Sequence, residues 1–144
     1  MKKVFMSIMY VVAFSWFVSC SSDDDSPNFY FTTLDVIEAD MPEFFELGKT
    51  YDIDVLFYRP NGCTYFEGFD VTKTTQTGRD VVVIGSVLTD QDVACTEAIE
   101  EVTATLRFSV IYTDEYNFRF YAGDDANGNP QFIEYTVPVE GTNP

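Results

Sequence analysis

The side chains best suited to take part in chemistry are the three cysteines, because the chain contains no histidine. Without histidine, a Ser-His-Asp or Cys-His nucleophile and a zinc site with imidazole ligands are both excluded. Cys63 and Cys95 lack the CxxC spacing of redox and metal sites, which leaves a disulfide or two buried thiols. Cys20 stands apart from this pair, directly after a long apolar run.

Carboxylates are the other groups that could support catalysis. Adjacent pairs such as Glu100-Glu101 and Asp114-Glu115 point to opposite sides of a strand, so they make poor acid/base pairs. We therefore expect a protein that is not an enzyme and holds no cofactor. A hydrolase that uses only carboxylates is the minor alternative, and two acidic side chains in one cleft would favour it.

Residues 123–130 form the one segment whose Asp, Asn and Gly residues are similar to those of a metal-binding loop. Aligned with an EF-hand, this segment has Gly123 where an aspartate is required, and a strand follows where the bidentate glutamate should come. Asn127-Gly128 between two alternating segments instead predicts a hairpin turn. Weak calcium binding by Asp124 and Asp125 is the alternative, and we expect no metal site.

The N-terminal segment has the layout of an export signal. Lys2 and Lys3 precede a mostly apolar run over residues 4–18, which is shorter than the ~20 residues that span a bilayer. Residues 17–20, Phe-Val-Ser-Cys, resemble the lipobox of bacterial lipoprotein precursors, although that family usually has an aliphatic residue at the position of Phe17. The resemblance implies a signal peptide over residues 1–19 and lipidation of Cys20 by acyl chains such as palmitate.

The polar residues that follow Cys20 strengthen this resemblance. They are Ser21, Ser22, Asp23, Asp24 and Asp25. They resemble the acidic export signal of surface lipoproteins of Bacteroidetes, while a solvated spacer is the simpler interpretation. The resemblance implies an outer-membrane lipoprotein, anchored through its N-terminal lipid and exposed at the cell surface, with residues 20–27 as the tether. An ordinary signal peptide that is cut near residues 15–19 is the alternative.

Export also bears on the remaining cysteines and on the possible partners. In an oxidising compartment an even pair such as Cys63 and Cys95 predicts a disulfide. Residues 1–19 hold two of the eight basic residues and none of the 24 acidic ones, so the remaining chain has a net charge near −18. This charge excludes nucleic acid as a partner. We expect residues 28–144 to form one monomeric domain.

Alternation of apolar and polar residues, together with runs rich in apolar, aromatic and β-branched residues, predicts seven strands in that domain, over residues 28–40, 51–58, 65–72, 79–88, 102–112, 116–121 and 133–139. In the segment 79–88, Arg79 and Asp80 are followed by a nearly continuous apolar run, which predicts a central strand. Gly68 predicts a bulge and Pro138 a strand end, while residues 98–101 are compatible with one helical turn. The pattern predicts an all-β fold, an antiparallel immunoglobulin-like β-sandwich of seven to eight strands, with a small β-barrel as the alternative.

Aromatic residues are abundant, and most of them fall on the predicted inward faces of the strands. Tyr58, Tyr65, Phe66 and Tyr121 are off the pattern or near turns, so they are weak candidates for a ligand-binding surface. We expect a lipid-anchored, non-enzymatic interaction or accessory module of a surface complex. The alternative is a glycan-binding lipoprotein that is accessory to a nutrient uptake system, which exposed coplanar Tyr and Phe side chains on one sheet face would favour.

Overall fold

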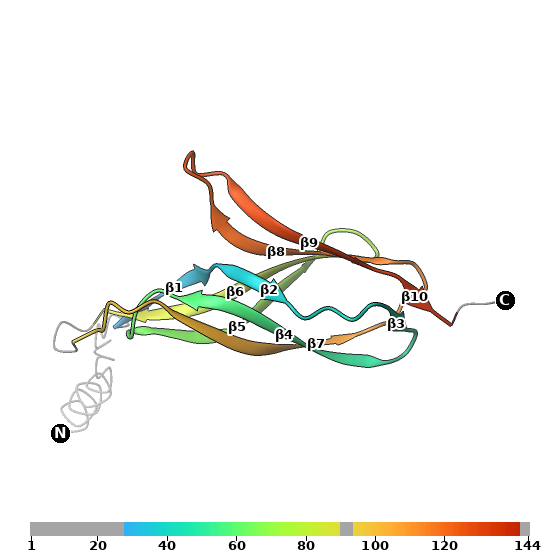
Figure 1. The fold of residues 1–144 in the computed structure, drawn as a ribbon, viewed down its shortest axis with the longest axis horizontal. Helices are drawn as coiled ribbons and strands as arrows, with labels where there is room; N and C mark the ends of the chain where they lie inside the picture. The colour runs from blue at the N-terminus through green and yellow to red at the C-terminus, as the bar shows by residue number, and fades with distance from the viewer. Residues whose placement is uncertain (1–27, 90–93, 142–144) are drawn as a thin grey trace, which may run out of the picture.

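The computed structural model describes residues 28–89 and 94–141, whose regular structure consists of ten β-strands (Figure 1). The strands are β1 Phe29–Leu34, β2 Val36–Ala39, β3 Phe45–Glu46, β4 Thr50–Arg59, β5 Thr64–Lys73, β6 Gly78–Leu88, β7 Glu100–Ser109, β8 Tyr116–Asp124, β9 Pro130–Val137 and β10 Val139–Glu140. Within these ranges, no helix is long and apolar enough to cross a bilayer.

Two sheets pack against each other, and β6 is the centre of the larger one. β5 pairs with one edge of β6 over nearly its whole length. The other edge is shared, because β1 pairs with the second half of β6 and β8 with the first half. β9 completes this sheet beside β8, and the smaller sheet has the order β2-β4-β7. The predicted central position of residues 79–88 is confirmed.

The fold is an all-β sandwich, as predicted, and it does not close into a barrel. The strands number ten because residues 28–40 divide at Asp35 into β1 and β2, which belong to different sheets, and because β3 and β10 add a two-residue pair. Most pairings are antiparallel, but the two-residue pair of β3 and β10 is parallel, and so is the pair of β6 and β8. The parallel pairing of β6 and β8 follows from the path of the chain. β7, which comes between them in the sequence, lies in the other sheet, and β8 then returns in the same direction as β6.

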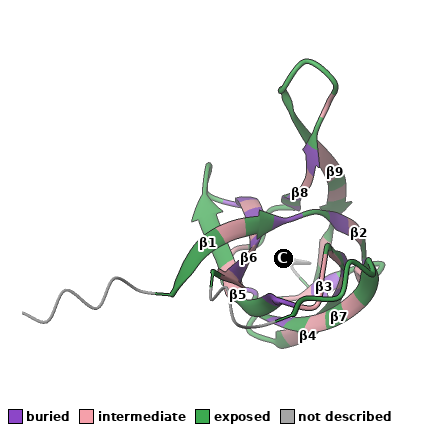
Figure 2. Ribbon diagram, turned by 90° about the vertical axis from the view of Figure 1, so that its left-hand side faces the viewer, coloured by how far each residue is buried: buried purple, intermediate pink, exposed green. Residues whose placement is uncertain are grey.

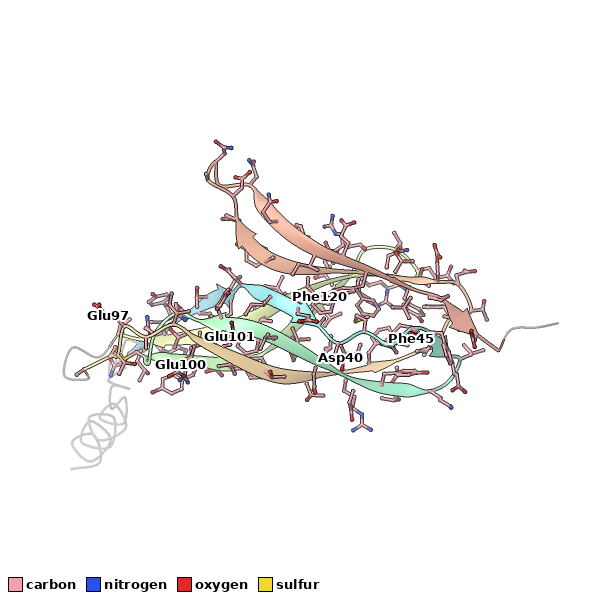
Figure 3. All side chains as sticks on the ribbon, viewed as in Figure 1. Asp40, Phe45, Glu97, Glu100, Glu101 and Phe120 are labelled. Carbon is pink, nitrogen blue, oxygen red and sulfur yellow. A yellow bond between two sulfur atoms is a disulfide. The ribbon has the colours of Figure 1, made fainter. Side chains whose placement is uncertain are left out.

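The core is formed by the alternating apolar residues of both sheets. Its fully buried side chains include Ile53, Val55 and Phe57 from β4 and Tyr116, Phe118 and Phe120 from β8. Phe45 contributes from β3, and Figure 3 shows Phe45 and Phe120 at different points along the length of the sandwich. The inward faces predicted for these segments are therefore confirmed.

Tyr116 fixes the corner between β7 and β8. Its hydroxyl oxygen accepts the backbone N–H groups of Ile111 at 3.1 Å and Tyr112 at 3.0 Å, although the side chain is completely buried. A tyrosine at the start of a strand whose hydroxyl bonds to the backbone a few residues upstream is a tyrosine corner, a feature typical of immunoglobulin-like sandwiches.

Three local predictions had different outcomes. The pairing register of β5 with β6 shifts between Phe66 and Gly68, which confirms the predicted bulge at Gly68. Pro138 lies between β9 and β10, at a strand end as predicted. The helical turn over residues 98–101 was wrong, because Glu100 and Glu101 pair with Arg59 and Tyr58 at the start of β7. Cross-strand pairing with β4 thus overrides the local preference of this segment.

Candidate functional site

The predicted tether lies outside the described residues. Cys20 and the acidic export segment, Ser21, Ser22, Asp23, Asp24 and Asp25, precede residue 28, where the described chain starts. The lipidation site and the export signal therefore stay predictions. The described chain begins at one end of the elongated sandwich and finishes at Gly141, at the opposite end (Figure 1).

A disulfide between Cys63 and Cys95 reinforces the end where the described chain begins. Their Cα atoms are 5.3 Å apart, and the bridge joins the start of β5 to the segment that precedes β7. Beside it, the Gly62 N–H donates to the Thr96 carbonyl oxygen at 2.9 Å. The predicted pairing of the two cysteines is present, and it holds the irregular residues 94–99 against the β4–β5 turn.

The same end carries a group of exposed aromatic residues, Phe29, Phe31 and Tyr65, which we call the aromatic surface. Phe31 of β1 and Tyr65 of β5 both pair with Ser86 of β6, so the three strands place them on one face of the larger sheet. Their exposed fractions are 40% for Phe29, 65% for Phe31 and 45% for Tyr65. They line an open depression of about 390 Å³, together with Glu67, Ser86 and Leu88.

The depression has one hydrogen-bonded polar pair between its aromatic walls. The Ser86 hydroxyl donates to Glu67 Oε1 at 2.5 Å. Ser86 is buried while Glu67 is exposed, so the carboxylate is held in place from below and remains open to donors from solvent. A carboxylate beside aromatic rings can accept hydrogen bonds from hydroxyl or ammonium groups. The site is therefore suited to a partly apolar ligand with a polar or cationic group.

The four aromatic residues predicted from the sequence do not form one surface. Tyr65 belongs to the aromatic surface, but Tyr58 lies on the smaller sheet, beside a small hollow of about 80 Å³ that Asp35 and Pro60 also line. Phe66 stacks on the core residue Phe57, with 5.5 Å between the ring centroids, and stays 38% exposed. Each of these three side chains is exposed to solvent, as predicted, but they face different directions.

Tyr121, the fourth, is half-buried at the base of the β8–β9 hairpin. Its hydroxyl donates to Asp124 Oδ1 at 3.0 Å. Burial, with Asp124 as a further contributor, raises the pKa of the Tyr121 hydroxyl above its ordinary value. Tyr121 therefore helps to hold the hairpin and is separate from the aromatic surface.

Phe29 and Phe31 were missing from the predicted site. Residues 29–31 are all aromatic, so the alternation that assigns a face to each side chain gives no signal there. Their exposure follows from the pairing of β1 with the end of β6, which local sequence does not encode.

The β8–β9 hairpin is a turn, as predicted, and it projects from the body of the sandwich (Figure 2). Asp125 Oδ1 accepts the N–H groups of Asn127 at 2.8 Å and Asn129 at 2.9 Å, and these bonds hold the pKa of Asp125 below its ordinary value. Gly128 has a φ of 80°, which the turn requires. In residues 28–89 and 94–141, no three metal-ligating side chains gather in a way that could hold an ion.

Three carboxylates also line an open depression on the outer face of the smaller sheet. Glu38, Asp40 and Asp54 lie there with Leu56 and Thr103, in about 310 Å³. All three are exposed, and the Thr105 hydroxyl donates to Asp54 at 2.7 Å. Two acidic side chains in one cleft would favour a carboxylate hydrolase, but this depression is open and all three carboxylates are exposed to solvent. The carboxylate hydrolase therefore stays the minor alternative.

The chain matches no protein-family model, and comparisons with curated proteins and with solved structures find no similar protein. The function is therefore inferred from the residues of this chain.

Proposed function

We propose that the protein is a lipid-anchored outer-membrane lipoprotein, exposed at the cell surface, that serves as a non-enzymatic interaction or accessory module. One relationship carries this proposal. The chain reaches its first strand at Phe29, only nine residues after the lipobox cysteine Cys20, and the aromatic surface starts on that same strand. A short tether, a disulfide-braced sandwich and a solvent-exposed aromatic surface suit a domain that is held at a membrane and makes contacts there.

The anchor is tested by the intact mass of the protein extracted from membranes, together with protease shaving of whole cells. We expect a mass equal to residues 20–144 plus acyl groups, and loss of the protein on shaving. The Cys20→Ser variant serves as the matched control, because it should keep the native circular dichroism spectrum but leave the membrane fraction. An unacylated wild-type chain in the culture medium would contradict the proposal and indicate a secreted domain.

Glycan binding is the second candidate function. The observation in its favour is that three exposed aromatic side chains line the same depression as an exposed carboxylate, since rings and polar groups together can bind a sugar. Phe29 and Phe31, however, meet edge to face, with an interplanar angle of 81°, so they do not form a flat stacking platform. Affinity electrophoresis in gels that contain surface polysaccharides tests this function. If the wild type and Tyr65→Ala migrate equally in these gels, glycan binding by the aromatic surface is rejected.

A further inference from the structure

Exposed large hydrophobic side chains are unevenly distributed along the sandwich. Of the eleven in the described part of the chain, seven lie toward the end where β1, β5 and β7 begin and β4 finishes. They are Phe29, Tyr30, Phe31, Tyr58, Tyr65, Phe66 and Ile99. Six of these seven are aromatic, and tyrosine and phenylalanine rings are favoured at the boundary between lipid and water.

The length of the tether keeps this end close to its attachment point. Eight residue steps separate Cys20 from Asn28, so even a fully extended chain spans at most about 30 Å. A tether this short holds the domain near the bilayer at an effective concentration on the order of millimolar, where weak contacts become populated. The aromatic surface is the first part of the sandwich that the tether brings to the membrane.

The charges of this region favour one kind of lipid surface. Glu97, Glu100 and Glu101 lie at this end of the sandwich (Figure 3), and Arg59 forms an ion pair with Glu100. An anionic surface would repel these carboxylates, whereas a zwitterionic surface with amine headgroups offers ammonium groups. Glu67, held by Ser86 between aromatic rings, is placed to accept such a group.

We propose that the aromatic surface rests on the lipid–water interface of the membrane that holds the Cys20 lipid, with Phe29, Phe31 and Tyr65 among zwitterionic headgroups and Glu67 facing their amines. This inference deepens the proposed function and depends on its lipid anchor. The three rings expose too little apolar area to hold the domain on a membrane alone, so the contact requires the tether.

Hydroxyl-radical footprinting of the acylated protein in phosphatidylethanolamine and phosphatidylcholine vesicles tests the inference. We expect oxidation of Phe29, Phe31 and Tyr65 to fall severalfold relative to the Cys20→Ser protein mixed with the same vesicles. Phe44 and Leu47, which are exposed at the opposite end, provide the internal control and should be oxidised equally in both samples. Equal oxidation of the aromatic surface in the two samples would overturn the inference.

Two variants and a change of lipid sharpen this test. In Phe29→Ser/Phe31→Ser/Tyr65→Ser, Leu88 in the same depression should lose the protection that it has in the anchored wild type. Phe44→Ser/Leu47→Ser should keep that protection. Added phosphatidylglycerol should weaken protection of the aromatic surface, because the domain is strongly acidic. Protection that grows with the anionic lipid would contradict the assignment of Glu67.

Failure of the anchor and failure of the surface contact can be told apart. The unacylated chain that begins at Cys20 can be coupled through that thiol to a maleimide lipid, which supplies a tether whether or not the natural protein is acylated. Protection in this sample supports the surface contact even if the natural anchor is absent. If soluble surface glycans protect the same rings of the Cys20→Ser protein without vesicles, the aromatic surface is a glycan site and the inference falls.

Discussion

The guanidinium carbon of Arg79 lies 5.5 Å from the centroid of the Tyr116 ring and 5.8 Å from that of Phe108, in a site where Arg79 is only 8% exposed. Its Nη1 atom donates to the backbone carbonyl oxygens of Gly78 at 2.7 Å and Gln76 at 3.3 Å. A buried positive charge is thus held by turn carbonyls and aromatic ring faces, at the start of the central strand.

Replacing Arg79 by lysine should lower the free energy of unfolding by about 2 kcal/mol, because a compact ammonium cannot stack on two rings and reach the same carbonyls. Urea denaturation followed by circular dichroism measures this change. Arg107→Lys, on the exposed face of β7, is the matched control and should stay within about 0.5 kcal/mol of the wild type. A similar loss in both variants would show that the stacked site has no special role.

Tyr116→Phe should destabilise the fold by about 1–3 kcal/mol, since the N–H groups of Ile111 and Tyr112 would lose their common acceptor. Tyr112→Phe provides the control, because the Tyr112 hydroxyl accepts only an exposed bond from Lys73. Thermal unfolding of the two variants makes the comparison. An unchanged midpoint in Tyr116→Phe would mean that water or another group replaces the hydroxyl.

Removal of the disulfide in Cys63→Ala/Cys95→Ala should cost roughly 3–4 kcal/mol on the chain-entropy model. The effect should also be local, with faster amide exchange at Gly62, whose partner Thr96 is held by the bridge, and little change in the β8–β9 hairpin. Hydrogen exchange by NMR distinguishes these regions. Uniformly faster exchange in both regions would contradict a local role.

The turn at the tip of the hairpin should respond to acid through Asp125. Bonds from Asn129 and Asn127 depress the pKa of this carboxylate in the folded protein below the ordinary value of 3.8. The stabilisation is therefore complete above pH 3.8 and is lost as the pH falls through the lower folded value. NMR titration should show the amides of Asn127 and Asn129 moving together with the Asp125 carboxyl. In Asp125→Asn, this acid-dependent movement should be absent.

The sequence predicts the strands wherever one face is buried and the other is exposed to solvent. Asp52 and Ile53 illustrate this in β4, where each side chain faces the side that its polarity indicates. The disulfide also follows from the cysteine pair and the export signal. The division of residues 28–40 does not, because Asp35 marks a change of sheet that depends on partners far away in the sequence.

The candidate surface was predicted less well, for a related reason. Tyr65 was recognised because its exposure follows from its place after a turn, whereas Phe29 and Phe31 become neighbours of Tyr65 only through β6. Tyr121 is half-buried at the base of its own hairpin, which alternation along one strand does not reveal. Exposure at these positions is a property of the assembled sheets.

The pairing of β1 with β6 also has a mechanical consequence. Six residue pairs, from Phe29 and Leu88 to Leu34 and Val83, join the first strand to the sandwich, and β6 lies within the loop closed by the disulfide. A pull on the N-terminal chain, resisted at the far end, runs along β1 and perpendicular to its hydrogen bonds. These bonds then share the load in shear, against a strand that a covalent loop retains, so the domain should withstand a sustained tensile force at its point of attachment.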